Sequence, residues 1–221
     1  MSRKAALTAI YQTLQQVFGD SGWWPADTPL EVMLGAVLTQ NTAWTNVEKA
    51  IVNLKTKNLL TFAALQTLDL AELAELIRPA GFFRVKALRL KALLAWLNES
   101  CAGNIELLSN CDTDELRQEL LNIKGVGPET ADAILLYALH RPVFVVDEYT
   151  RRIFSRHGMA PQEIDYHELQ SLFTDALPED VKMFREYHAY IVSVAKKWCK
   201  RHKPDCLNCP LRPFLDQDFY E

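Results

Sequence analysis

The chain has 221 residues, of which 49% are apolar and 24% charged, with only 8 glycines. This composition is typical of a globular protein and excludes a fibrous repeat or a disordered chain. The net charge of −4 excludes a generally basic protein, so contact with a polyanion would depend on local clusters of Lys and Arg. Two clusters are present, although solvated helix faces would explain either one as well: Arg84, Lys86, Arg89 and Lys91, and Lys196, Lys197, Lys200, Arg201 and Lys203.

The first twenty residues have apolar side chains at helical spacing and lack the long uncharged segment of a secretion signal or a membrane span. We therefore expect a cytosolic protein with no membrane partner. Three of the five cysteines fall within residues 199–209. In a reducing compartment such a cluster favours metal ligation over disulfides. Cys101 and Cys111 are expected to be small hydrophobic side chains.

Apolar residues recur at helical period along almost the whole chain, which predicts an all-α fold. Residues 142–146, PVFVV, are the one β-like run and are expected to form an extended connector. Thr61, Asp69, Thr113 and Asp165 are expected helix starts, and Gly81 and Gly158 are expected ends. After a helix at the N-terminus, the expected helices cover 30–40, 43–54, 61–68, 70–81, 84–97, 114–123, 129–139, 148–156, 167–177 and 179–198.

Residues 114–139, DELRQELLNIKGVGPETADAILLYAL, predict two helices joined by a tight turn at Lys124, Gly125, Val126 and Gly127. The glycines permit positive φ and keep side chains away from anything that approaches the turn. Pro128 suits the first turn of the second helix, whose unpaired N–H groups can bind a phosphate. A turn of this kind can also simply join two packed helices.

Asp147 follows the extended run at the expected start of a helix, where an aspartate is usually an N-cap. The G-V-G turn, the segment TADAIL, the apolar run and V-D at the next helix start together resemble the helix-hairpin-helix (HhH-GPD) DNA glycosylases of the endonuclease III superfamily. The resemblance implies that Asp147 is the essential catalytic carboxylate.

The resemblance extends over most of the chain. Residues 36–51, AVLTQNTAWTNVEKAI, are similar to the family's helix whose glutamine, here Gln40, fills the gap that the flipped nucleotide leaves in the duplex. Residues 80–93, AGFFRVKALRLKAL, are similar to the family's phosphate-contacting turn. The side chains and backbone groups that the resemblance assigns to DNA binding are Gln40, Lys86, Lys124, Gly125, Val126, Gly127 and Thr130.

Glu129 occupies the position of the lysine that forms a Schiff base with the flipped nucleotide in bifunctional members of the family. A carboxylate cannot form an imine. We therefore expect a monofunctional glycosylase in which water is the nucleophile. Asp147 would either stabilise the positive charge that develops at C1′ or orient that water.

Trp23, Trp24 and Pro25 precede the Gln40 segment, and Trp44 lies within it. Core packing would explain any one of these tryptophans. As a group they predict an aromatic pocket for a cationic alkylated base, and the pattern is similar to the 3-methyladenine DNA glycosylase III subgroup. That subgroup has a pocket lysine near the end of its long C-terminal helix. Lys196 is the better match and Lys197 its neighbour, although phosphate contact would also explain either lysine.

Two other functions remain open. One is an endonuclease III-like glycosylase, with or without lyase activity, that acts on oxidised pyrimidines or mismatches. The other is a non-catalytic module that binds damaged or distorted DNA, against which Asp147 argues. For the favoured function we expect a monomer that acts on double-stranded DNA containing a damaged base, in the prokaryotic cytoplasm at the nucleoid.

The fold that the resemblance implies has two helical lobes. Residues 26–141 would form a six-helix barrel that contains the hairpin at 114–139. Residues 1–25 and 142–221 would form the second lobe, which ends in a cysteine-rich loop at 199–215.

Cys199, Cys206 and Cys209 have the spacing C-x6-C-x2-C, which is similar to the first three ligands of the family's C-x6-C-x2-C-x5-C iron–sulfur loop. The fourth ligand position is Leu215, which cannot bind iron. Three interpretations remain: a [4Fe–4S] cluster completed by another residue, zinc bound by three cysteines and one His or Asp, and a loop without metal. The candidates for the fourth cluster ligand are Asp216, Asp218 and His202. A metal-free loop would be held by packing of Trp198, Leu207, Leu211 and Phe214.

Overall fold

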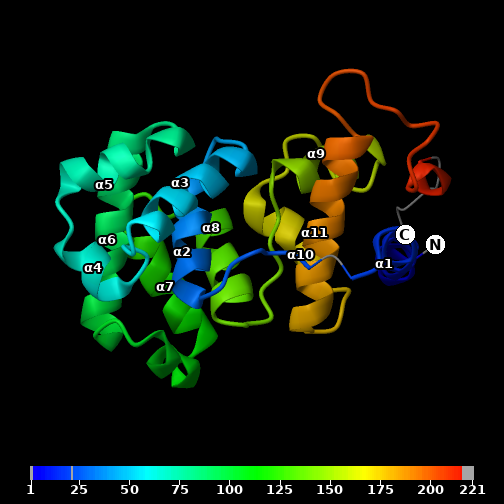
Figure 1. The fold of residues 1–221 in the computed structure, drawn as a ribbon. Coiled ribbons are helices and arrows are strands. Elements are labelled where there is room, and N and C mark those ends of the chain that lie inside the picture. Colours follow the sequence, from blue (N-terminus) through cyan, green and yellow to red (C-terminus); the bar gives the residue numbers. More distant parts are fainter. Residues whose placement is uncertain (1, 21, 216–221) are drawn as a thin grey trace. The chain divides into compact units, whose positions relative to one another are not determined.

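The structure, a computed structural model, describes residues 2–20 and 22–215 (Figure 1). Over these ranges the chain forms helices joined by turns and contains no β-strand, so the predicted all-α class is confirmed. Contacts between residues divide the chain into two compact units. We call Ala26–Arg141 the central unit, and Met1–Pro25 together with Pro142–Glu221 the terminal unit.

The central unit is built around one largely apolar helix that is buried on nearly all sides. Nine of the ten residues of α2 are buried, and the helix contacts α3, α6, α8 and the π-helical turn. A helix that is apolar all round belongs in a core, and Pro29 at its first position follows the N-cap Thr28. The elements of this unit are α2 (Pro29–Leu38), α3 (Trp44–Thr56), α4 (Phe62–Thr67), α5 (Leu70–Leu76), α6 (Phe83–Cys101), α7 (Thr113–Asn122), α8 (Pro128–Ala133), the 3-10 helices Arg78–Ala80 and Ile105–Asn110, and the π-helical turn Ile134–Ala138.

Three sequence predictions for this unit are wrong in detail. The helix expected at 70–81 ends at Leu76 and is followed by a short 3-10 helix, because Pro79 disfavours the α conformation in the residue before it. The helix expected at 129–139 changes from α to π geometry after Ala133. The helix expected at 30–40 ends at Leu38, so Gln40 lies in the turn that follows it.

The terminal unit packs aromatic side chains around its longest helix. Its elements are α1 (Arg3–Phe18), α9 (Glu148–Arg156), α10 (Tyr166–Thr174), α11 (Val181–Lys197) and the 3-10 helix Arg212–Phe214. Helix α11 contacts both α1 and α9. Residues 142–146 are extended without strand pairing, as predicted, and bring Phe144 against Phe173, Phe184 and Tyr187 at ring-centroid distances of 4.1, 5.1 and 5.7 Å.

Helix caps and cysteines test further predictions. Thr61, Asp69 and Asp165 are N-caps as expected, whereas Asp112 rather than Thr113 caps α7. Cys101 is buried as expected. Cys111 is exposed, which contradicts the prediction, because it lies at the end of a surface 3-10 helix. Among the described helices, none combines the length and the apolar character needed to cross a bilayer.

Candidate active site and DNA-contacting hairpin

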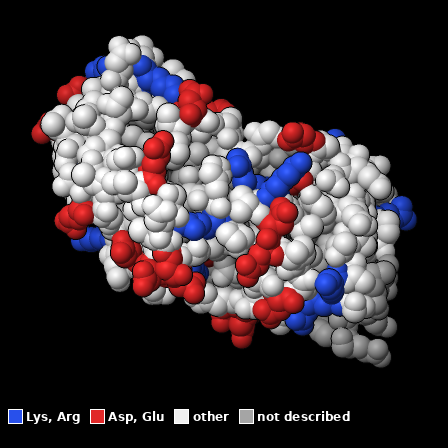
Figure 2. All heavy atoms as spheres, turned by 90° about the horizontal axis from the view of Figure 1, so that it is seen from below, with Lys and Arg blue, Asp and Glu red and all other residues white. Residues whose placement is uncertain are grey.

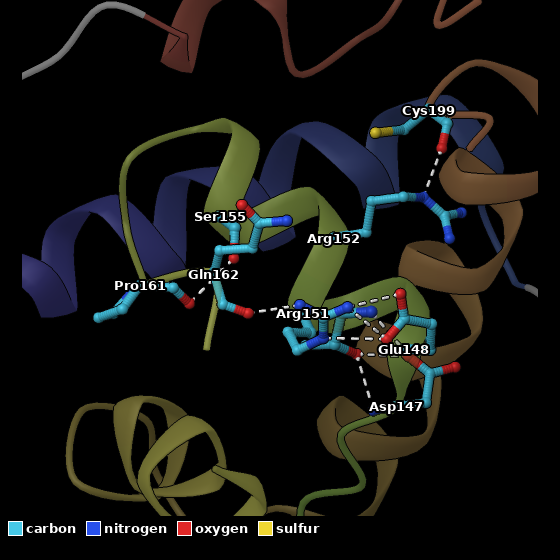
Figure 3. Close-up of polar contacts among 9 residues, drawn as sticks. Asp147, Glu148, Arg151, Arg152, Ser155, Pro161, Gln162 and Cys199 are labelled. Carbon is cyan, nitrogen blue, oxygen red and sulfur yellow. Dashed lines mark hydrogen bonds and ion pairs between the residues drawn. The ribbon is translucent and has the colours of Figure 1, made fainter. Parts of the chain in front are cut away.

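Asp147 lies at the start of α9 (Figure 3), where it is the N-cap and takes part in a capping box with Thr150. Its Oδ1 accepts hydrogen bonds from the Thr150 backbone N–H at 2.7 Å and from the Thr150 hydroxyl at 2.8 Å. The Asp147 N–H donates to Thr150 Oγ1 at 3.3 Å. Because Oδ1 is held on both sides, the carboxylate has a defined orientation at the start of the helix.

The second carboxylate oxygen of Asp147 faces a histidine of α11. Oδ2 lies 3.7 Å from Nε2 of His188, and the two side chains are only 10% and 8% exposed. Burial by itself raises the pKa of Asp147, but His188 and the hydrogen bonds from Thr150 outweigh burial and hold this pKa below its usual value. His188 was not among the predicted site residues. The signal that could have identified it is a lone histidine among the apolar residues of a buried helix face.

Three of the predicted base-pocket residues come together in the terminal unit. The rings of Trp23 and Trp24 meet edge to face at a centroid distance of 6.2 Å. Nζ of Lys196 lies 5.3 Å from the centroid of the Trp23 ring, within the range of a cation–π contact. Both tryptophans are half-buried, whereas Pro25 and Lys196 are exposed. Trp44, also half-buried, begins α3 in the central unit.

The turn between α7 and α8 presents backbone to solvent. Lys124, Gly125 and Gly127 are exposed, and Glu129 is exposed in the first turn of α8. Gly125 has positive φ, at 91°, whereas Gly127 is the N-cap of α8 with φ of −101°. A Cβ on Gly127 would meet no atom within 4 Å, so the N-terminus of α8 is open, as phosphate binding requires.

Gln40 is attached to this hairpin by its side chain. Its Nε2 donates to the Gly125 carbonyl at 3.0 Å and to Thr130 Oγ1 at 2.9 Å, and its Oε1 accepts from Arg89 Nη1. A Cβ on Gly125 would come within 2.5 Å of the Arg89 side chain, so this position needs glycine for space as well as for conformation.

Two predicted DNA contacts of the hairpin need correction. The side chain of Thr130 is buried and is bonded to Gln40, so it does not face a DNA backbone. The side chain of Val126 is also buried, which leaves only its backbone for a phosphate contact.

The prediction that Lys86 contacts phosphate is also wrong. Lys86 is 1% exposed, and its Nζ donates to the Leu38 carbonyl at 2.9 Å and to the Ala80 carbonyl at 2.7 Å. Burial, and then the nearby charge of Arg89, lower its pKa. The lysine therefore joins the end of α2 to the turn before α6.

Exposed charges are mixed on the face of the molecule drawn in Figure 2. On this face, Lys and Arg side chains are interspersed with Asp and Glu and do not form a continuous basic surface. Lys91 of the first cluster is also used internally, because its Nζ donates to the carbonyls of Leu65 and Gln66 at 2.9 and 3.0 Å. Arg84 of this cluster remains exposed.

Phe82 is an exposed aromatic residue that sequence reasoning missed. It precedes α6, is 71% exposed and has the left-handed φ of 46°. Val85 and Leu88, in the first turns of the same helix, are 49% and 57% exposed. An exposed run of apolar side chains of this kind is typical of a binding surface.

The three clustered cysteines line one small cavity of the terminal unit. Cys199, Cys206 and Cys209 share this cavity with His157 and with Leu215, the position of the family's fourth ligand. The proposed ligand His202 is exposed and does not line it. Asp216 and Asp218 lie outside the described residues.

Comparison with known proteins identifies the family. Residues 34–179 match the HhH-GPD superfamily of base excision DNA repair proteins. The chain belongs to this superfamily. Its relatives include MJ1434 of Methanocaldococcus jannaschii, provisionally named a DNA repair glycosylase, which is 49% identical over 93% of both chains. Endonuclease III of Thermotoga maritima is 29% identical over 83% of this chain and 81% of its own.

Solved structures of HhH-GPD proteins have the same fold. The Helicobacter pylori 3-methyladenine DNA glycosylase MagIII, bound to 1,N6-ethenoadenine, matches 89% of this chain and 98% of its own with a TM-score of 0.76 and 30% identity. An endonuclease III–DNA complex matches 98% of this chain and 96% of its own with a TM-score of 0.82 and 24% identity. At this identity the match shows that the two proteins have the same fold. The chain is thus a base-excision-repair DNA glycosylase of the HhH-GPD family.

Proposed function

We propose that this glycosylase is monofunctional and removes alkylated purines such as 3-methyladenine from double-stranded DNA, with Asp147 as the catalytic carboxylate. The observation that carries the proposal is the geometry of Asp147. One of its oxygens is fixed by two hydrogen bonds, and the other lies beside His188 in a site that is nearly closed to solvent. Its lowered pKa keeps the group anionic at neutral pH.

An anionic carboxylate is what cleavage of this glycosidic bond requires. Positive charge develops at C1′ as the base departs, and an oriented carboxylate in a site of low dielectric stabilises that charge. An alkylated purine is already cationic and leaves as a neutral base, so little general acid catalysis is needed. Asp147 can also orient the attacking water through Oδ2 and accept a proton from it, while Oδ1 remains in the helix cap.

Glu129 supports the monofunctional mode. It is exposed in the first turn of α8, at the position where bifunctional members have a lysine. A carboxylate cannot attack C1′ to form an imine, and therefore cannot open the route to β-elimination. Water remains as the nucleophile.

The substrate class is supported by the aromatic cluster. Trp23 and Trp24 present half-buried indole rings with Lys196 beside the first, and a flipped base is generally read by stacking on such rings. The 30% identity with MagIII, a 3-methyladenine DNA glycosylase bound to 1,N6-ethenoadenine, supports the same class.

DNA would be held by the exposed hairpin backbone, Lys124 and the open N-terminus of α8. The exposed ring of Phe82 is suited to stack against bases of a distorted duplex. We expect the protein to act as a monomer in the prokaryotic cytoplasm.

Base release from defined duplexes tests the proposal. The purified protein is incubated with duplexes containing 3-methyladenine, 1,N6-ethenoadenine or an oxidised pyrimidine, and free base is measured by chromatography. We expect release of the purine adducts and no covalent adduct after borohydride treatment. Faster release of the oxidised pyrimidine, or a borohydride-trapped protein–DNA adduct, would favour an endonuclease III-like enzyme. Binding without release of any base would favour a non-catalytic module.

A further inference from the structure

The side-chain amide of Gln40 is held at both of its polar groups. Its Nε2 donates to the Gly125 carbonyl at 3.0 Å and to Thr130 Oγ1 at 2.9 Å. A side-chain amide has two protons, so both are used within the protein. Its Oε1 accepts from Arg89 Nη1. Gln40 therefore joins three segments of the central unit: the turn after α2, helix α6 and the hairpin between α7 and α8.

Arg89 determines which way this amide is turned. A guanidinium group can only donate hydrogen bonds, so it must face the oxygen of the Gln40 amide. The NH2 group is then directed at the Gly125 carbonyl, which can only accept. The stem of Arg89 also lies against the hairpin, since a Cβ on Gly125 would come within 2.5 Å of Arg89 Cγ. A hydrogen bond from a charged donor is stronger than one between neutral groups, so Arg89 keeps the amide in this orientation.

The amide in turn fixes the backbone of the hairpin. The Gly125 carbonyl accepts from Gln40. The other end of the same peptide group, the Val126 N–H, donates to the Ile123 carbonyl at 3.0 Å. In the described part of the chain, the N–H groups of Gly125 and Gly127 have no backbone acceptor. A phosphate is attracted by such N–H groups and repelled by a carbonyl oxygen, so the bond to Gln40 turns the hairpin into a better phosphate contact.

We propose that Arg89 and Gln40 are positioning residues of the glycosylase, which together orient the hairpin for contact with DNA phosphate. Arg89 sets the amide of Gln40, and the amide keeps the Gly125 carbonyl away from the phosphate. The proposal rests on the contact between the hairpin and DNA that is proposed above. Neither side chain touches DNA in this role. Gln40 has no amide proton left for a base, so its role differs from the gap filling that the resemblance implies.

Binding of the full chain to two duplexes tests the proposal. One duplex is undamaged and the other contains a tetrahydrofuran abasic-site analogue, and affinity is measured by fluorescence anisotropy over a series of salt concentrations. Gln40→Met and Arg89→Met have side chains of similar length without the hydrogen bonds. Each should weaken binding to both duplexes by the same factor, about three- to tenfold, because the hairpin contacts the DNA backbone and not the lesion.

Two further readouts separate positioning from direct contact. The double variant should bind as the weaker single variant does, because the two side chains act through one hydrogen-bonded pair. The slope of log affinity against log salt should stay close to wild type in Arg89→Met, whereas loss of a phosphate contact reduces it by about one. Arg89→Lys retains a donor for Gln40 Oε1 and should restore most of the affinity. Gln118→Met, at an exposed glutamine of α7, is the matched control and should bind as wild type does.

Several results would overturn the proposal. Weaker binding of Gln40→Met to the abasic duplex alone would mean that Gln40 acts inside the lesion. A salt slope reduced by about one in Arg89→Met would mean that Arg89 contacts phosphate directly. Wild-type affinity in either variant, or additive losses in the double variant, would show that the two residues do not position the hairpin as a pair.

Circular dichroism of each variant checks the fold. If neither methionine variant folds, hydrogen exchange of the Gln40 side-chain amide in wild-type protein decides. Protection that persists on both duplexes supports the proposal, and protection that is absent from the free protein or lost on the abasic duplex contradicts it. Wild-type affinity in Lys124→Ala would instead count against the hairpin contact itself, and base release by the wild type is measured separately.

Discussion

Replacement of His188 by glutamine removes the charge that the imidazole carries when protonated, while it keeps a polar side chain of similar size beside Asp147. Nε2 of His188 lies 3.7 Å from Oδ2 of Asp147, and both side chains are almost fully buried. The contact lowers the pKa of Asp147, whereas burial raises it. Without His188 the effect of burial dominates, so the pKa of Asp147 should rise.

The distance sets an upper limit on the effect. Two unit charges 3.7 Å apart attract by about 4 kcal/mol at an effective dielectric constant of about 20. Thr150 continues to donate to Oδ1 in the variant, so part of the stabilisation of the carboxylate remains. We therefore expect the pKa of Asp147 to rise in His188→Gln, by less than this attraction alone would give.

The assay is single-turnover release of an alkylated purine from a duplex, measured over a series of pH values from neutral to acidic. A carboxyl with a raised pKa loses its negative charge earlier as the pH falls. The His188→Gln rate should therefore begin to fall at a higher pH than the wild-type rate. His167→Gln, at an exposed histidine, is the matched control. Superimposable profiles of His188→Gln and wild type would refute the assigned role of His188.

Three further substitutions test the DNA-binding surface and the correction to it. Lys86→Met leaves the carbonyls of Leu38 and Ala80 without their donor, so it should lower the free energy of unfolding by about 1 to 3 kcal/mol. The salt dependence of DNA binding should stay unchanged. A shallower salt dependence would restore Lys86 as a phosphate contact. Lys124→Ala, at an exposed position of the hairpin, should leave stability unchanged and reduce the slope of log affinity against log salt by about one, measured by fluorescence anisotropy. An unchanged slope would exclude phosphate contact by Lys124. Phe82→Ala should weaken binding to a duplex with a damaged base by about 1 to 2 kcal/mol without lowering the melting temperature, because the ring is 71% exposed. Equal affinity of wild type and Phe82→Ala would mean that the ring does not touch DNA.

Features that depend on neighbouring residues were predictable from the sequence. The hairpin at 124–127, the caps Asp69 and Asp165, and the extended connector follow from local chemistry, and the structure contains each of them. Asp147 was predicted as an N-cap and, through the resemblance, as the catalytic group. The two roles are compatible in one carboxylate, because the cap occupies one oxygen and leaves the other directed at His188.

Features that depend on packing were not predictable. Lys86 stands in a motif that resembles a phosphate-contacting turn, but its stem passes through the core and its ammonium group bonds to two carbonyls. His188 is far from Asp147 in sequence, and only the packing of α9 against α11 places the two side chains side by side. Thr130 was expected to contact DNA, but its side chain is buried and its hydroxyl accepts a hydrogen bond from Gln40.

Asp147→Asn tests the catalytic claim most directly, because asparagine caps a helix as well as aspartate does and carries no charge. Its side-chain oxygen can still accept the hydrogen bonds from Thr150, so the melting temperature should stay close to that of wild type. The measurement is the single-turnover rate of free-base release from DNA containing 3-methyladenine. We expect the rate to fall by at least about a hundredfold, the size typical for loss of one electrostatic contact to the transition state. Release of the base by folded Asp147→Asn as fast as by wild type would contradict the account.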